Sequence, residues 1–209
     1  MKKLNHYTLL AEMFRYPTAD LKLHAEKWRD LISRYDVSLA PRLERFVNHI
    51  SCKPLSFQQE YYISTFDVQA MCFLDIGYVL YGEDYRRGIF LVNIKKEQIK
   101  AGNDCGGELP EHLPNILTLL PKMADADLAE ELICSLLIPA VNEMIKEFRD
   151  VSNLYRGLLE ILAVIMETDF PDSVYERFTF NTRKKGAAHE DLPDEIMNRE
   201  CVNYKIKTE

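Results

Sequence analysis

The sequence predicts an all-α protein, a single-domain bundle of about eight to ten helices. Apolar residues recur at intervals of three and four along almost the whole chain, which is the pattern of amphipathic helices. Only 78–81 has a strand-like composition, and this stretch is too short to support a sheet. With 209 residues and 47% hydrophobic content, the chain is long enough to bury one core. We therefore expect one helical domain over 1–180, followed by a polar, mobile tail over 181–209.

The N-terminal part of the chain carries three amphipathic segments. The first spans 4–14 and ends before a proline. The second spans 21–35, and the hydroxyl of Thr18 can cap its start. The third spans 39–50, where Ser38 can serve as the cap. We expect each segment to bury one apolar face.

Two helical segments follow, one on each side of Asp67. The first spans 57–65. The second spans 71–81 and ends at Gly82, because glycine favours the C-terminal end of a helix. Two interpretations of Asp67 stay open: the residue caps the helix through 71, or it binds a ligand.

The next segment, 89–99, also has the helical period and ends at Gly102. Its apolar residues Ile89, Val92 and Ile99 are expected to face the core.

The C-terminal half contains a short helix over 113–120 and two longer apolar segments. Segment 128–148 contains Pro139, which removes a backbone hydrogen bond and conflicts with the preceding turn. We expect a kink there, or two abutting helices. Segment 154–166 is apolar nearly all round, so we place this helix at the centre of the bundle.

Charge and cysteine content exclude several classes of protein. The 26 basic and 33 acidic residues give a net charge of −7, whereas nucleic-acid-binding domains usually carry a basic excess. The five cysteines include no C-x-x-C pair, so we expect free thiols in a reducing cytoplasm. No stretch reaches the ~20 apolar residues needed to span a bilayer, and no signal peptide is recognisable. We expect a cytoplasmic protein without stable membrane insertion.

Recognisable catalytic machinery is absent from the sequence. No histidine follows a glutamate at the Glu-x-x-His spacing of helical di-iron sites. Glu108 and His112 are close in sequence, but Pro110 lies between them, and this pattern does not favour a metal site. Glycine-rich phosphate loops and a nucleophile elbow are also missing. The sequence therefore favours a binding protein without a cofactor over an enzyme.

Three short strings carry more specific information. The first is Tyr-Ile-Ser-Thr-Phe-Asp at 62–67. The second is Tyr-Gly-Glu-Asp-Tyr-Arg-Arg-Gly at 81–88, and the third is Glu-Leu-Pro-Glu-His-Leu-Pro at 108–114. In this order and spacing they resemble the motifs of the NarJ branch of the TorD/DmsD family of molybdoenzyme assembly chaperones.

The resemblance implies a helical, cofactor-free cytoplasmic chaperone. Separately, we expect a monomer or a dimer that exchanges helical halves through the loop around 102–110. Such chaperones bind the apo catalytic subunit of a molybdenum-containing respiratory oxidoreductase, often through its N-terminal segment. In some members that segment is a twin-arginine signal or its remnant. The chaperone holds the subunit while the molybdenum cofactor and an iron–sulfur cluster are inserted. For the NarJ branch, the implied client is nitrate reductase.

The three strings also supply the residues that we expect to bind the client peptide. An amphipathic peptide would place its apolar face on aromatic side chains and its basic residues near carboxylates. Glu111 and His112 are expected to form an exposed acid–histidine pair, because such a pair on a loop contributes little to folding. The candidate client-binding residues are Tyr62, Phe66, Asp67, Tyr81, Glu83, Arg87, Glu108, Pro110, Glu111 and His112.

Two alternatives stay open at this point. Arg86 and Arg87 can pair with Glu83 or Asp84 and fix a loop, instead of binding a ligand. The alternative function is that of an all-α adaptor or regulatory protein without a molybdoenzyme client.

Overall fold

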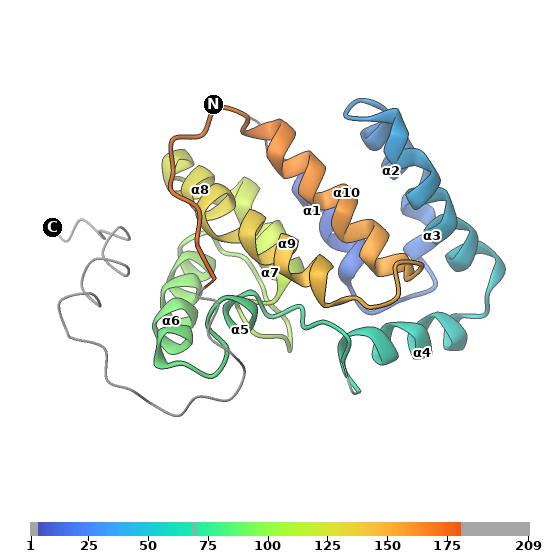
Figure 1. The fold of residues 1–209 in the computed structure, drawn as a ribbon, viewed down its shortest axis with the longest axis horizontal. Helices are drawn as coiled ribbons and strands as arrows, with labels where there is room; N and C mark the ends of the chain where they lie inside the picture. The colour runs from blue at the N-terminus through green and yellow to red at the C-terminus, as the bar shows by residue number, and fades with distance from the viewer. Residues whose placement is uncertain (1–3, 69, 181–209) are drawn as a thin grey trace, which may run out of the picture. The chain divides into compact units, whose positions relative to one another are not determined.

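The computed structural model describes residues 4–68 and 70–180, and over these residues the protein is all-α, as predicted (Figure 1). The predicted tail, 181–209, lies outside the described residues. The β-pairing found in the described residues is one isolated antiparallel bridge between Asp75 and His112. The α-helices are α1 (His6–Ala11), α2 (Ala25–Ser33), α3 (Ala40–Cys52), α4 (Leu55–Phe66), α5 (Ile76–Tyr81), α6 (Tyr85–Lys100), α7 (Leu113–Leu119), α8 (Ala126–Glu131), α9 (Ile138–Glu147) and α10 (Leu154–Asp169).

Helix α10 lies at the centre of the core, where its composition predicts it. Leu158, Leu162 and Met166 are fully buried, as are most of their apolar neighbours on the same helix. Helix α10 packs between α9 and α3, and α1 packs against α7 (Figure 1). Fully burying one such side chain contributes about 1.5–3 kcal/mol relative to leaving it exposed. This helix therefore holds the N-terminal and C-terminal parts of the bundle together.

The caps of the N-terminal helices differ from the prediction. Asp36, not Ser38, supplies the cap before α3, because its carboxylate accepts a hydrogen bond from the Ser38 backbone N–H at 2.8 Å. Thr18 contributes its backbone carbonyl, which accepts a hydrogen bond from Leu21 N–H at 3.1 Å, and α2 begins only at Ala25. Both differences have one cause: a short 3₁₀ turn precedes each helix and moves the capping position.

The inward face of α6 is the opposite of the one predicted. Phe90, Ile94 and Gln98 are buried, whereas Ile89, Val92 and Ile99 are exposed. Both faces of α6 have apolar residues at intervals of three and four, so periodicity alone does not show which face is buried. The buried face is the one whose polar residue finds hydrogen-bond partners in the core. The Gln98 amide is buried because it donates hydrogen bonds to the carbonyls of Pro110 at 3.0 Å and Asn115 at 3.3 Å. The predicted inward orientation of Ile89, Val92 and Ile99 is therefore wrong.

The expected break at Pro139 takes the form of a π-helical segment. Helix α8 continues into π-helical turns over Leu132–Leu137, and Pro139 then occupies the first turn of α9. In an α-helix the Ser135 carbonyl would accept a hydrogen bond from residue 139, but proline has no N–H. That carbonyl instead accepts a hydrogen bond from Phe178 N–H at 2.8 Å. The break therefore fixes the stretch of chain that follows α10.

Two further predictions concern the thiols and the membrane. Cys52, Cys72, Cys105 and Cys134 are free thiols in the described residues, as predicted. Burial raises the pKa of Cys72 to about 12, so this thiol is inert at neutral pH. None of the helices in the described ranges combines the length and the apolar character needed to cross a bilayer.

Candidate functional site

The isolated bridge between Asp75 and His112 joins two segments that are far apart in the sequence. Ile76 N–H donates a hydrogen bond to Glu111 O at 3.1 Å, and Leu113 N–H donates one to Leu74 O at 2.9 Å. The bridge places the third string, 108–114, against the loop that connects α4 to α5. The first string lies on α4 and leads into the same loop. The fold therefore brings the first and third strings to one place.

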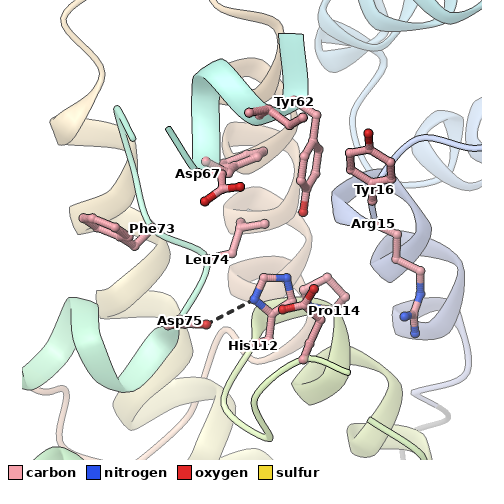
Figure 2. Close-up of a pocket in the computed structure, with 12 residues that line it drawn as sticks. Arg15, Tyr16, Tyr62, Asp67, Phe73, Leu74, Asp75, His112 and Pro114 are labelled. Carbon is pink, nitrogen blue, oxygen red and sulfur yellow. Dashed lines mark hydrogen bonds and ion pairs between the residues drawn. The ribbon is translucent and has the colours of Figure 1, made fainter. Parts of the chain in front are cut away.

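A pocket of about 680 Å³ lies at this junction. Its walls come from the C-terminal half of α4 and the loop after it, from the segment 108–114 that leads into α7, and from the short stretch that follows α1. Figure 2 shows Tyr62, Leu74 and His112 around this space. The lining residues are Arg15, Tyr16, Tyr62, Ile63, Phe66, Asp67, Phe73, Leu74, Asp75, Glu108, His112 and Pro114. The volume lies within the range of about 300–1,000 Å³ that is usual for ligand sites.

The aromatic part of the pocket is held firmly by the core behind it. The Tyr62 hydroxyl donates a hydrogen bond to Phe14 O at 3.0 Å, and burial raises the pKa of Tyr62 above its ordinary value. The Tyr62 ring packs edge-on against Phe66, at 5.1 Å between ring centroids. On its other side, the half-exposed Tyr16 meets Tyr62 edge-on at 5.6 Å. This part of the pocket presents rigid apolar surface to a ligand.

The charged part of the pocket is mainly acidic. Asp67, Asp75 and Glu108 supply carboxylates, and Arg15 supplies a guanidinium that already pairs with Glu12 at 3.1 Å. Figure 2 shows Asp67 and Asp75 on the same side as Phe73, opposite Arg15. A site with apolar walls and an excess of carboxylates favours a ligand that is both apolar and positively charged.

Asp75 and His112 are oriented by charged residues behind the pocket. His112 Nδ1 lies 3.1 Å from Asp75 Oδ1 (Figure 2), and Asp75 Oδ2 accepts a hydrogen bond from Arg87 at 3.4 Å. Arg87 also forms an ion pair with Glu111 at 2.5 Å and stacks over the Tyr78 ring at 5.1 Å. A chain of contacts therefore runs from the buried Glu111 through Arg87 and Asp75 to His112 at the pocket surface.

The predicted exposed Glu111–His112 pair is wrong: Glu111 is buried, and the His112 side chain is only 14% exposed. Glu111 is 0% exposed, and only His112 reaches the pocket. Burial raises the pKa of Glu111, and the hydrogen bond and charge of Arg87 partly oppose this effect. The sequence gives no sign of this burial, because the partner of the carboxylate, the partly exposed Arg87, comes from another string.

Gly77 makes this buried arrangement possible. A Cβ atom added at Gly77 would collide with Glu111 Oε2 and would lie 2.8 Å from Phe90 Cδ1. Only a glycine leaves room here for the Glu111 carboxylate against α5. The second and third strings therefore meet through the ion pair between Arg87 and Glu111. Gly77 permits this contact because it has no side chain.

The pocket includes some of the predicted client-binding residues and leaves others outside. Tyr62, Phe66, Asp67, Glu108 and His112 line it. Arg87 and Glu111 are not among the lining residues, and they pair with each other beside the pocket. Tyr81, Glu83 and Pro110 are not among the lining residues.

Those three residues have other surroundings. The Tyr81 ring packs against Phe90 and Phe178. The Pro110 carbonyl accepts a hydrogen bond from Gln98, and Glu83 is exposed in the turn before α6.

Two alternatives from the sequence can now be decided. Helix α4 ends at Phe66 and α5 begins only at Ile76, so Asp67 does not cap a helix through residue 71. Arg86 pairs with Asp84 at 3.1 Å, as one interpretation predicts, but Arg87 pairs with Glu111 and Asp75 instead. The second string therefore makes one ion pair within itself, through Arg86, and ion pairs with distant residues through Arg87.

Sequence reasoning missed several lining residues. Arg15 and Tyr16 come from the stretch after α1, and their proximity to Tyr62 depends on packing between distant segments. No local motif marks such a contact. Asp75 was also missed, because the sequence places it inside a predicted helix over 71–81, whereas α5 begins only at Ile76 and Asp75 contacts Arg87 and His112.

The described residues hold no group of three or more histidine, cysteine, aspartate or glutamate side chains arranged to bind a metal ion. Comparison with protein-family models and with curated proteins finds no match to this chain. The pocket and the resemblance of the three strings are therefore the features that bear on function.

Proposed function

We propose that this protein is a cytoplasmic assembly chaperone of the NarJ type. In this proposal it binds the apo catalytic subunit of a molybdenum-containing oxidoreductase, with nitrate reductase as the leading client. It binds the N-terminal segment of that subunit and holds it while the molybdenum cofactor and the iron–sulfur cluster are inserted. The chaperone itself carries out no chemical step and needs no cofactor.

One observation supports this proposal above the others: residues of the first and third strings line a single pocket. Tyr62, Phe66 and Asp67 come from the first string, and Glu108 and His112 from the third. The resemblance of these strings to a chaperone family rests on sequence alone and is independent of where they lie in the fold. Their convergence on one concave surface is what a shared binding role predicts.

The chemistry of the pocket suits an amphipathic peptide with basic residues. The apolar walls can take one or more anchor side chains from the apolar face of a peptide helix. The carboxylates of Asp67, Asp75 and Glu108 can then meet lysine or arginine side chains beside that face. Most of the peptide would lie across the pocket mouth, where Tyr16 and Phe73 expose about half of their surface.

Calorimetric titration with synthetic N-terminal peptides of molybdoenzyme catalytic subunits tests the proposal. We expect micromolar or tighter binding of one peptide to the full chain. The double variant Asp67→Asn/Glu108→Gln should weaken that binding by about 1–2 kcal/mol, or five- to thirtyfold. The matched control, Asp172→Asn/Glu176→Gln, removes the same charge from exposed residues outside the pocket and should leave the affinity unchanged.

The outcomes separate the proposed function from its alternative. Equal weakening in both double variants would mean that net charge, not the pocket, sets the affinity. If no molybdoenzyme peptide binds and the full chain co-purifies with a protein of another class, the adaptor function is correct and the chaperone proposal fails.

A further inference from the structure

Helix α6 carries a second apolar face that points away from the core. Ile89, Val92 and Ile99 are exposed to 45%, 52% and 71%, although they are large aliphatic residues. With the exposed Lys96, they occupy positions i, i+3, i+7 and i+10, which align along one side of a helix. We call these four residues the α6 stripe. The proposed peptide-binding function does not use it, because no residue that lines the pocket comes from α6.

The spacing of the α6 stripe fits one particular kind of partner. Intervals of three, four and three residues are those of the a and d positions in a coiled-coil seam. Such a seam is narrow and accepts a single helix along its length. A lysine at one a position, as Lys96 would be, also selects a partner residue of opposite charge and fixes the register. The geometry therefore points to a helix rather than to a flat surface.

The charges beside the α6 stripe are positive. Lys95, Lys96 and Lys100 are exposed on or next to it, and Lys100 pairs with Glu97 of the same helix at 2.6 Å. A partner helix would therefore have to bring carboxylates to both the seam and its edge.

We propose that the α6 stripe is a docking surface for an acidic amphipathic helix of another protein. The apolar residues of that helix cover Ile89, Val92 and Ile99, and its carboxylates meet Lys95 and Lys96. This surface is additional to the pocket, and the proposal does not depend on what the pocket binds.

Two other occupants fit the charges less well. A second copy of this chain would bring a second set of lysines against Lys95 and Lys96, and like charges facing each other oppose association. An anionic bilayer would have to contact a wide area of a protein whose net charge is −7, whereas a single helix contacts only the stripe. Charge complementarity therefore favours an acidic helix.

A pair of synthetic peptides tests the proposal on the full chain. Each peptide has about three heptads with Ile and Leu at a and d. The acidic peptide carries Glu at the flanking positions and at one a position, and the basic peptide carries Lys at the same places. We expect the acidic peptide to bind at least tenfold more tightly than the basic one, with an affinity that falls as salt is added.

Two variants locate the binding. In Lys95→Glu/Lys96→Glu the preference should reverse, so that the basic peptide binds more tightly. In Val92→Ser/Ile99→Ser both peptides should lose affinity. All four positions are exposed, so unchanged circular dichroism and melting temperature are expected for both variants.

Several results would overturn the proposal. These are equal binding of the two peptides, no binding of either, and a preference that does not reverse in the lysine variant. A dimer of the chain alone that dissociates in Val92→Ser/Ile99→Ser would assign the stripe to self-association. Binding to phosphatidylcholine vesicles with about 30% phosphatidylserine, without peptide binding, would assign it to a membrane surface.

Discussion

At Gly77, helix α5 passes so close to Glu111 that the added methyl group of an alanine would overlap the carboxylate. The Glu111 carboxylate holds Arg87, and Arg87 in turn holds Asp75 at the edge of the pocket. An ion pair with one fully buried partner is sensitive to displacement, because a displaced charge has no water to replace its partner. The arrangement of the site therefore depends on a glycine at position 77.

Replacing Gly77 with alanine should destabilise the protein by about 1–3 kcal/mol, because Glu111 and Phe90 must both move. Gly88 is the matched control: it lies within α6, and an added Cβ would meet nothing within 4 Å. Gly88→Ala should stabilise by about 0.5–1 kcal/mol, since alanine is the better helix former. Urea denaturation measures both values. Equal effects of the two substitutions would contradict the close packing described at Gly77.

Among the elements, α10 has the largest role in the core. Leu162 is fully buried at its middle, and Leu162→Ala should cost about 2–5 kcal/mol through lost burial and the remaining cavity. Thr168→Ala, an exposed position near the end of the same helix, should change stability by less than about 0.5 kcal/mol. Thermal and urea unfolding give both values. A loss near zero for Leu162→Ala would show that the core can close around the missing side chain.

The elements also show where sequence periodicity suffices and where it fails. Helix α10 was predictable because it is apolar on most sides, so any packing arrangement buries it. Helix α6 has apolar residues on two faces, and the buried Gln98 decides between them through hydrogen bonds to the loop before α7. Those hydrogen bonds form only in the folded chain. The predicted inward face was wrong for that reason.

At the scale of the whole molecule, a buried carboxylate joins the two ends of the helical domain. Asp169 at the end of α10 contacts His6 Nε2 at 2.7 Å and accepts a hydrogen bond from Tyr7 at 3.0 Å. It accepts another hydrogen bond from Tyr35, also at 3.0 Å. Burial alone would raise the pKa of Asp169, but the hydrogen bonds and charge of His6 and the two tyrosine hydroxyls outweigh it and lower the pKa.

This lowered pKa predicts how stability depends on pH. A carboxyl group with a lowered folded-state pKa stabilises the protein fully above its unfolded pKa, about 3.9 for aspartate, and loses that contribution as the pH falls through the folded value. The free-energy gap between wild type and Asp169→Asn should therefore narrow as the pH falls from about 5 to below 4. Chemical unfolding across this range measures the gap. A gap that stays constant to pH 3 would show that Asp169 keeps an ordinary pKa.

The candidate site was predictable only where neighbouring residues in sequence are also neighbours in space. Tyr62, Phe66 and Asp67 were identified because one short string contains all three, and they line the pocket. Arg15 and Tyr16 join them through packing of distant helices, which no local pattern records. Glu111 was misplaced because its burial depends on Arg87 and Gly77, both outside its own string.

The bridge between Asp75 and His112 has a consequence for how a ligand would associate. Two backbone hydrogen bonds within the protein join the walls of the pocket, so the walls need little further ordering when a ligand binds. The conformational entropy lost on association then falls mainly on an initially unstructured ligand. Preorganising the ligand, for example by covalently stapling it as a helix, should therefore prolong the complex more than further rigidifying the pocket would.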